Sequence, residues 1–211
     1  MRKLITLALV SLLCLSLSGC FLTSMQPFYE PGKTLDEPAL LGTWHMKNCS
    51  ENDEVKEKYC VLVIEPGRTE RDGKPEKGYR ITFRDERNLG SEYEGFLFEA
   101  GGARFLDTSM KEGPKVDIAF AIHVVTGHVA WKTEVAGQTL SLTPLKRSLA
   151  REAASLQPPA ATFEYDGDTI LSGKTPEVRA LLEKFAMNPE SYEKTLQWKK
   201  GPAPGAGPKK K

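Results

Sequence analysis

The sequence has few of the residues from which catalytic and metal sites are built. Its 211 residues include four cysteines and three histidines. No G-x-S-x-G elbow, H-E-x-x-H zinc helix, P-loop or G-x-G-x-x-G fingerprint occurs. His45, His123 and His128 lack the i, i+4 spacing of a helical metal site, and His45 and His128 alternate with Trp44 and Trp131, which predicts outward-facing polar side chains. We therefore predict no catalytic residue, no metal and no cofactor, and an enzyme ranks behind the two functions considered below.

An excess of charge of one sign is also missing. There are 29 Lys and Arg against 28 Asp and Glu, and hydrophobic residues make up 40% of the chain. This balance is typical of a globular protein and argues against binding to nucleic acid, which needs a basic surface. The length allows one ordinary domain with appendages.

No apolar run is long enough to span a bilayer. Leu4 to Leu17 is an apolar stretch of 14 residues behind the charged start Met1-Arg2-Lys3, whereas a spanning helix needs about 20 residues. The order of charged start, apolar run and small residues is typical of a secretory signal peptide, here residues 1–19.

The end of this signal resembles the lipobox of bacterial lipoproteins. In Leu17-Ser18-Gly19-Cys20, the resemblance implies that Cys20 receives a diacylglyceryl thioether and, after cleavage before it, an acyl chain such as palmitate on its new amine. Phe21 is not the Asp that commonly retains such proteins in the inner membrane, which implies a periplasm-facing place on the outer membrane. The alternative is an ordinary signal peptide with a cysteine there by chance.

Two cysteines remain for the folded protein. Cys49 and Cys60 flank a strongly polar segment, and an exported protein folds in an oxidising compartment. We predict a Cys49–Cys60 disulfide at the base of a hairpin, with two free thiols as the alternative.

Short runs separated by turn residues predict a mainly β fold. Tyr79, Ile81 and Phe83 alternate with polar residues, as expected for a strand with one buried face. Pro66 to Lys77 is expected to be a charged loop. About eight strands joined by tight turns predict an antiparallel meander that closes into a barrel. The expected strands are Gly42 to Lys47, Cys60 to Glu65, Gly78 to Arg84, Glu92 to Glu99, Arg104 to Thr108, Val116 to Val125, His128 to Val135 and Thr139 to Thr143.

Two helices are expected near the C-terminus. Thr143-Pro144 and Thr175-Pro176 each combine an N-cap hydroxyl with a proline at the first helical position. Leu145, Leu149 and Leu156 would line one face of the first helix, and the second should end before Asn188-Pro189. Thr169 to Ser172 could add a ninth strand.

Composition divides the mature chain into three parts. Residues 20–38 contain three prolines and no regular period, which predicts a tether. Residues 39–198 form the domain, and residues 199–211 form a Lys/Pro/Gly tail expected to be disordered from Gly201 onward. The tail's five lysines could attract anionic lipid or an anionic envelope polymer; a solvated tail without a partner is the alternative.

Several short stretches occur in an order that resembles a group of uncharacterised bacterial lipoproteins with lipocalin-like (calycin-type) barrels. The resemblance implies that Trp44 packs across the closed end of the barrel, and it implies no activity. The two added helices depart from the lipocalin pattern. The stretches are Gln26-Pro27-Phe28-Tyr29, Pro38 to Trp44, Arg104-Phe105-Leu106-Asp107 and Thr175 to Phe185.

Two functions are compatible with these features. The first is a membrane-anchored binding module whose barrel holds an apolar small molecule or lipid. The second is a structural or interaction lipoprotein with a packed core that contacts an envelope partner. The aromatic residues that could line a ligand cavity, or could be ordinary core, are Tyr79, Phe83, Phe96, Phe98 and Trp131.

Overall fold

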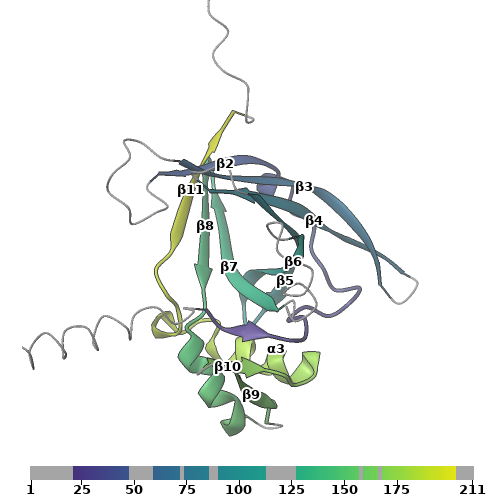
Figure 1. The fold of residues 1–211 in the computed structure, drawn as a ribbon, viewed down its shortest axis with the longest axis vertical. Coiled ribbons are helices and arrows are strands. Elements are labelled where there is room, and N and C mark those ends of the chain that lie inside the picture. Colours follow the sequence, from purple (N-terminus) through teal and green to yellow (C-terminus); the bar gives the residue numbers. More distant parts are fainter. Residues whose placement is uncertain are drawn as a thin grey trace, which may run out of the picture.

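The computed structural model describes residues 21–47, 59–71, 74–85, 90–112, 127–156, 159–165 and 168–202. Eight antiparallel strands close into a barrel (Figure 1), which confirms the predicted mainly β fold. The barrel strands are β2 (Gly42–Lys47), β3 (Tyr59–Arg71), β4 (Lys74–Arg84), β5 (Gly90–Ala100), β6 (Ala103–Glu112), β7 (His128–Ala136), β8 (Thr139–Pro144) and β11 (Leu196–Gly201).

Strands β2 to β8 form the predicted meander, and β6 pairs with β7 as part of the closed ring. The last barrel strand, β11, lies between β8 and β2. The predicted boundary between domain and tail, after Trp198, therefore falls inside a strand, because Lys199 and Lys200 continue the pairing with β2. Gly201, where disorder was predicted to begin, also belongs to this strand and pairs with Thr43. The expected strand at Val116 to Val125 lies outside the described residues.

The buried side chains form two separate cores. The inner core comes from strands around the whole barrel and fills its interior, whereas the outer core lies between β5 to β7 and the helices on one side. The inner core comprises Leu40, Trp44, Cys60, Leu62, Ile64, Tyr79, Ile81, Leu97, Leu106, Leu140, Leu142 and Trp198. The largest side chains of the outer core are Leu22, Phe28, Tyr29, Phe96, Phe98 and Phe105.

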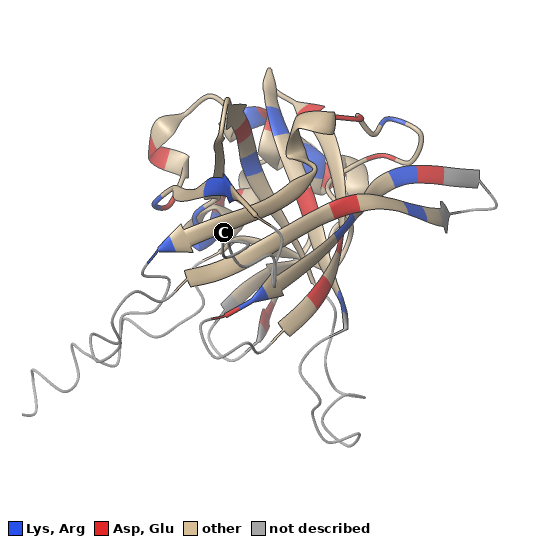
Figure 2. Cartoon of the chain, turned by 90° about the horizontal axis from the view of Figure 1, so that it is seen from above, with Lys and Arg blue, Asp and Glu red and all other residues tan. Residues whose placement is uncertain are grey.

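The predicted charged loop between β3 and β4 is instead a long two-stranded arm. Cross-strand pairing continues from Glu65↔Arg80 to Arg71↔Lys74, and the arm carries charges of both signs (Figure 2). Gly67 pairs with Gly78 in this ladder. A Cβ at position 67 would lie 2.8 Å from the backbone of Tyr79, so the strand needs glycine there. Glycine and proline, typical of turns, here occur within strands.

The first expected helix begins later than predicted. β8 continues through Pro144, and a 3-10 helix, η2 (Arg147–Ser155), follows with Lys146 rather than Thr143 as its N-cap. Of the three leucines predicted to line its face, only Leu149 lies within the helix, since Leu145 precedes it and Leu156 is its C-cap; all three are buried.

The second expected helix is confirmed as α3 (Thr175–Phe185), which buries Val178, Leu181 and Leu182. Its N-cap is Lys174, whose backbone N–H donates to Glu177 at 3.0 Å. The helices pack with three short strands, β1 (Thr23–Ser24), β9 (Thr162–Tyr165) and β10 (Asp168–Leu171). The other two 3-10 helices are η1 (Pro38–Leu40) and η3 (Pro189–Ser191).

Residues 21–37, called here the N-terminal segment, do not form the predicted tether. Leu22, Phe28 and Tyr29 are at most 1% exposed, and Tyr29 stacks on Phe96 at 4.4 Å between ring centroids. The segment fills the groove between the barrel wall and the helices. It lacks a regular period because it follows that groove rather than a helix or a long strand.

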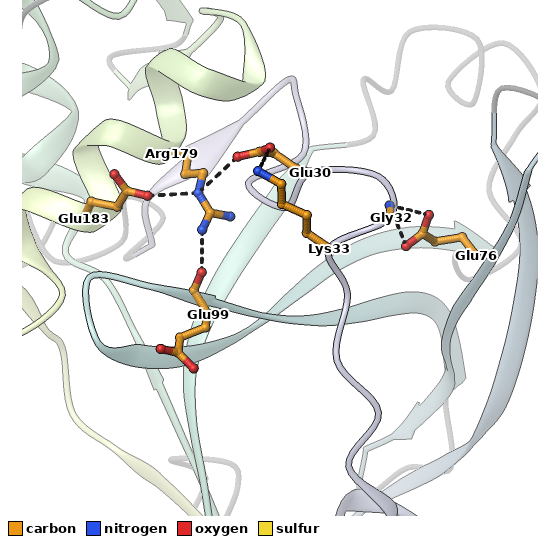
Figure 3. Close-up of polar contacts among 7 residues, drawn as sticks. All are labelled: Glu30, Gly32, Lys33, Glu76, Glu99, Arg179 and Glu183. Carbon is orange, nitrogen blue, oxygen red and sulfur yellow. Dashed lines mark hydrogen bonds and ion pairs between the residues drawn. The ribbon is translucent and has the colours of Figure 1, made fainter.

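Polar contacts hold the middle of the N-terminal segment against α3 (Figure 3). Arg179 Nε lies 2.9 Å from Glu183 and 3.5 Å from Glu30, and Arg179 Nη2 donates to the Glu99 carbonyl at 2.5 Å. Lys33 Nζ lies 2.6 Å from Glu30. The hydrogen bond from Lys33 and the charges of Lys33 and Arg179 lower the pKa of Glu30, although burial opposes this shift.

The next residues of the segment pass between β4 and β5, which pair only from Tyr79↔Gly95 to Arg84↔Gly90. The Glu76 carboxylate is 5% exposed and accepts hydrogen bonds from Gly32 N at 2.9 Å and from the Thr34 hydroxyl at 2.7 Å. The segment ends at Glu37, the N-cap of η1, which crosses one end of the barrel.

The first and last described parts of the chain lie far apart along β8. Phe21 pairs with Lys146 beyond one end of this strand, and Lys200 N donates to the Gln138 carbonyl beyond the other. At about 3.3 Å per residue, this separation is on the order of 25 Å.

Candidate functional site

A cavity lies where β6 and β7 separate. Their ladder extends only from Ser109↔His128 to Phe105↔Lys132, although β7 continues to Ala136. The opening between them is covered by η1 and by the turn after β5, and it holds a cavity of about 560 Å³. This volume is within the range of small-molecule sites, which are about 300 to 1,000 Å³.

The cavity lining is half polar and half apolar, and its four charged side chains, called here the rim, are Glu37, Arg104, Lys132 and Glu134. Arg104 Nη1 donates to Glu37 at 3.0 Å, and Lys132 Nζ lies 3.8 Å from Glu134. Each cation is therefore beside a carboxylate, and the rim carries no net charge. This arrangement suits a ligand with an apolar body and a polar group without net charge. The apolar lining residues are Ala39, Leu40, Leu97, Ala103, Val135 and Met187.

Tyr192 packs beside this rim. Its hydroxyl donates to the Ala186 carbonyl at 2.6 Å, and Lys132 Nζ lies 5.2 Å from its ring centroid. Burial, with the negative charge of Glu134, raises the pKa of Tyr192 to about 12.

Alkaline pH is therefore expected to destabilise the protein through Tyr192. In the unfolded chain tyrosine ionises near pH 10, whereas in the folded protein Tyr192 keeps its proton to about pH 12. Tyr192 therefore does not lower the free energy of unfolding below pH 10, but it lowers it by about 2 kcal/mol as the pH rises toward 12. Urea unfolding at pH 9 and 11.5 should show this loss, and Tyr192→Phe should reduce it. Because burial also raises the pKa of Tyr79, an equal loss in both proteins would contradict the assignment to Tyr192.

A buried polar pair lies on the outer face of the same barrel wall. Asp107 is 1% exposed; its Oδ2 accepts the Phe28 backbone N–H at 2.9 Å, and its Oδ1 lies 3.0 Å from His128 Nδ1. His128 faces outward from the barrel, as predicted, but it is not on the open surface, since its side chain is 13% exposed. The N-terminal segment covers this part of β7.

The five aromatic residues proposed as a ligand lining do not line the cavity. Tyr79 belongs to the inner core, and Phe83 and Trp131 pack against it. Phe96 and Phe98 belong to the outer core. Each of the five also makes a specific ring or hydrogen-bond contact. The Tyr79 hydroxyl accepts from Glu37 N at 2.8 Å, and Trp131 Nε1 donates to Thr108. Phe83 packs edge-on to Trp198, Phe96 stacks on Tyr29, and Phe98 stacks on Phe105.

The structure describes three of the other residues singled out in the sequence, Trp44, His45 and Cys60. Trp44 is fully buried, and its Nε1 donates to the Leu40 carbonyl at 2.8 Å, which joins it to η1. His45 is half-buried with Nε2 3.1 Å from the Pro202 carbonyl. Cys60 is 2% exposed. Cys20, Cys49 and His123 lie outside the described residues, so the lipid and the disulfide stay predictions.

The sequence analysis missed the residues at the cavity rim and the Asp107–His128 pair. The rim residues belong to segments that are distant in sequence, so no local spacing marks them. The burial of Asp107 could have been predicted, because it lies two residues from Phe105 and therefore on the same strand face.

Within the described ranges, no group of three or more His, Cys, Asp or Glu side chains is placed to hold a metal ion. Among the helices described, none is long and apolar enough to cross a membrane. Strand order and closure define a lipocalin-like barrel with two added helices. Comparisons of the chain with protein-family models, curated proteins and solved structures find no match.

Proposed function

We propose that this protein is a lipid-anchored envelope lipoprotein whose barrel binds an apolar small molecule or lipid. The cavity of about 560 Å³ at one end of the barrel carries the proposal. The lipobox-like sequence that ends at Cys20 supports the anchor, and the absence of Asp at position 21 supports an outer-membrane location facing the periplasm.

The binding site differs from a deep central cup. Trp44, Leu62 and Trp198 are among the side chains that fill the barrel interior, so the space for a ligand is the cavity between η1 and β7. Its apolar lining would contact the ligand body, and the paired charges at its rim would contact an uncharged or zwitterionic polar group.

Ligand recovery tests the binding site. Solvent extraction of protein purified from its native membrane should release one class of amphiphile, identified by mass spectrometry. Val135→Trp places a larger side chain in the cavity lining and should reduce the recovered amount at least tenfold. Tyr59→Trp, at a side chain that is 39% exposed and outside the lining, is the matched control. Extracts without ligand, or equal recovery from both variants, would refute the binding site.

The anchor is tested separately. Metabolic labelling with an alkyne fatty acid should mark the wild-type protein, and Cys20→Ser should abolish both the label and membrane fractionation. At about 0.8 kcal/mol per buried methylene, two or more chains give stable attachment, so the loss should be nearly complete. Labelling that persists in Cys20→Ser would place the lipid on another residue.

A structural or interaction role is the second candidate, and the β3–β4 arm favours it. The arm projects from the barrel with charges of both signs (Figure 2), and Arg80 and Glu65 pair across it at 2.8 Å. Cross-linking from the arm in intact cells should then capture one dominant envelope protein. A cross-linking pattern that is unchanged when the cross-linker is moved from the arm to Met187, which is 68% exposed and outside the arm, would exclude this role.

A further inference from the structure

The residues on either side of β1 include two of the four exposed large apolar side chains of the described chain. Phe21 is 37% exposed and Met25 is 38% exposed. The residues between them include Leu22 and Ser24, which are buried, and Leu22 belongs to the outer core. Phe21 and Met25 are therefore the large apolar side chains that this part of the chain leaves exposed.

Phe21 is held firmly by the domain. Its backbone pairs with Lys146, and its ring lies 5.2 Å from the Trp131 ring at an interplanar angle of 60°. The next residue, Leu22, donates its N–H to the Leu145 carbonyl at 3.0 Å. Cys20 is the adjacent residue in the sequence, so a lipid on Cys20 begins about 3.8 Å along the chain from a packed residue. No flexible spacer separates the anchor from the barrel.

We propose that Phe21 and Met25 form a contact surface for the lipid bilayer that holds the anchor, so that the barrel has one orientation on the membrane. This inference rests on the lipidation of Cys20 proposed above. Two partly exposed side chains would not bind a membrane stably by themselves. The anchor keeps them at the bilayer surface at high effective concentration, which makes a weak contact persist.

The neighbouring charge favours the same partner. Lys146, which is partly exposed, pairs with Phe21 through its backbone. A cation near an anionic bilayer surface adds about 1 kcal/mol of attraction. An apolar pair beside a cation matches the interface between acyl chains and anionic headgroups.

Depth-dependent fluorescence quenching tests the orientation. The full lipidated chain carries an NBD probe on an azide-bearing residue at Gln26, which is exposed beside Met25, or at Met187, which is 68% exposed and outside the N-terminal segment. Each protein is reconstituted into vesicles of zwitterionic and anionic phospholipid that contain a headgroup-level quencher lipid. Quenching at position 26 should be at least threefold stronger than at position 187.

Two further variants separate docking from anchoring. Eight Gly/Ser residues inserted between Cys20 and Phe21 should leave fatty-acid labelling and vesicle flotation intact but reduce quenching at position 26 to the level at 187. Phe21→Ser together with Met25→Ser should weaken quenching without loss of flotation. Equal quenching at both positions in a labelled, floating protein would overturn the docking surface and leave the anchor standing. An unlabelled protein that does not float would overturn both.

Discussion

Asp107→Ala is expected to lower the free energy of unfolding by about 3 to 5 kcal/mol. The Asp107 carboxylate is buried and contacts the Phe28 backbone N–H and the His128 ring. Its removal leaves a buried N–H and a buried ring nitrogen without their partner, and losing one member of such a pair costs several kcal/mol. At roughly 2 to 4 °C per kcal/mol for a domain of this size, thermal unfolding should shift by about 6 to 20 °C.

The matched control is Asp36→Ala. Asp36 is 60% exposed, and its carboxylate lies 3.9 Å from Lys77, which makes a surface pair worth less than about 1 kcal/mol. Hydrogen exchange adds a local measurement, because the Phe28 amide should lose protection in Asp107→Ala. If the two variants unfold at the same temperature, Asp107 does not hold the N-terminal segment.

Trp44→Ala should have a comparable effect, about 3 to 5 kcal/mol, through lost packing. Trp44 is the largest fully buried side chain of the inner core, and Lys200 Nζ lies 5.2 Å from its ring centroid. Truncating a buried aromatic side chain removes its transfer free energy and leaves a cavity. Denaturant unfolding monitored by far-UV circular dichroism measures the loss.

Trp44→Phe separates the ring from its hydrogen bond. It keeps most of the buried area but loses the Nε1–H that donates to the Leu40 carbonyl, so a loss of about 1 to 2 kcal/mol is expected. Met187→Ala, at a side chain that is 68% exposed, is the control and should change stability by less than about 0.5 kcal/mol. A Trp44→Ala protein as stable as this control would refute the role of Trp44 in closing the barrel at η1.

Local patterns predicted most of the barrel because each strand pairs mainly with its neighbours in the chain. Tyr79 and Ile81 alternate with polar residues, and both are buried. β11 escaped prediction because Lys199 and Lys200 follow Trp198 and resemble the start of a tail, and only pairing with the distant β2 makes them a strand. The arm was missed because glycine and proline usually mark loops.

The N-terminal segment and the cavity could not be predicted for a related reason. Phe28 and Tyr29 are buried by surfaces from other parts of the chain, which leave no period in the segment itself. The cavity rim brings together Glu37, Arg104 and Lys132, whose proximity depends on how far the β6–β7 ladder extends. Ladder length is set by tertiary packing, not by the propensity of either strand.

The position of β11 has a consequence for folding kinetics. β2 pairs with β11 through Trp44↔Lys200, so two strands about 150 residues apart in the sequence must meet before the ring is complete. During synthesis the earlier strands can form their local hairpins, but β2 and β8 keep one open edge each until the last barrel strand arrives. Closing so long a loop slows folding, and open edges in the interim invite pairing with other chains. Loss of the final few strand residues would therefore affect the yield of soluble protein more than the small number of contacts in β11 suggests.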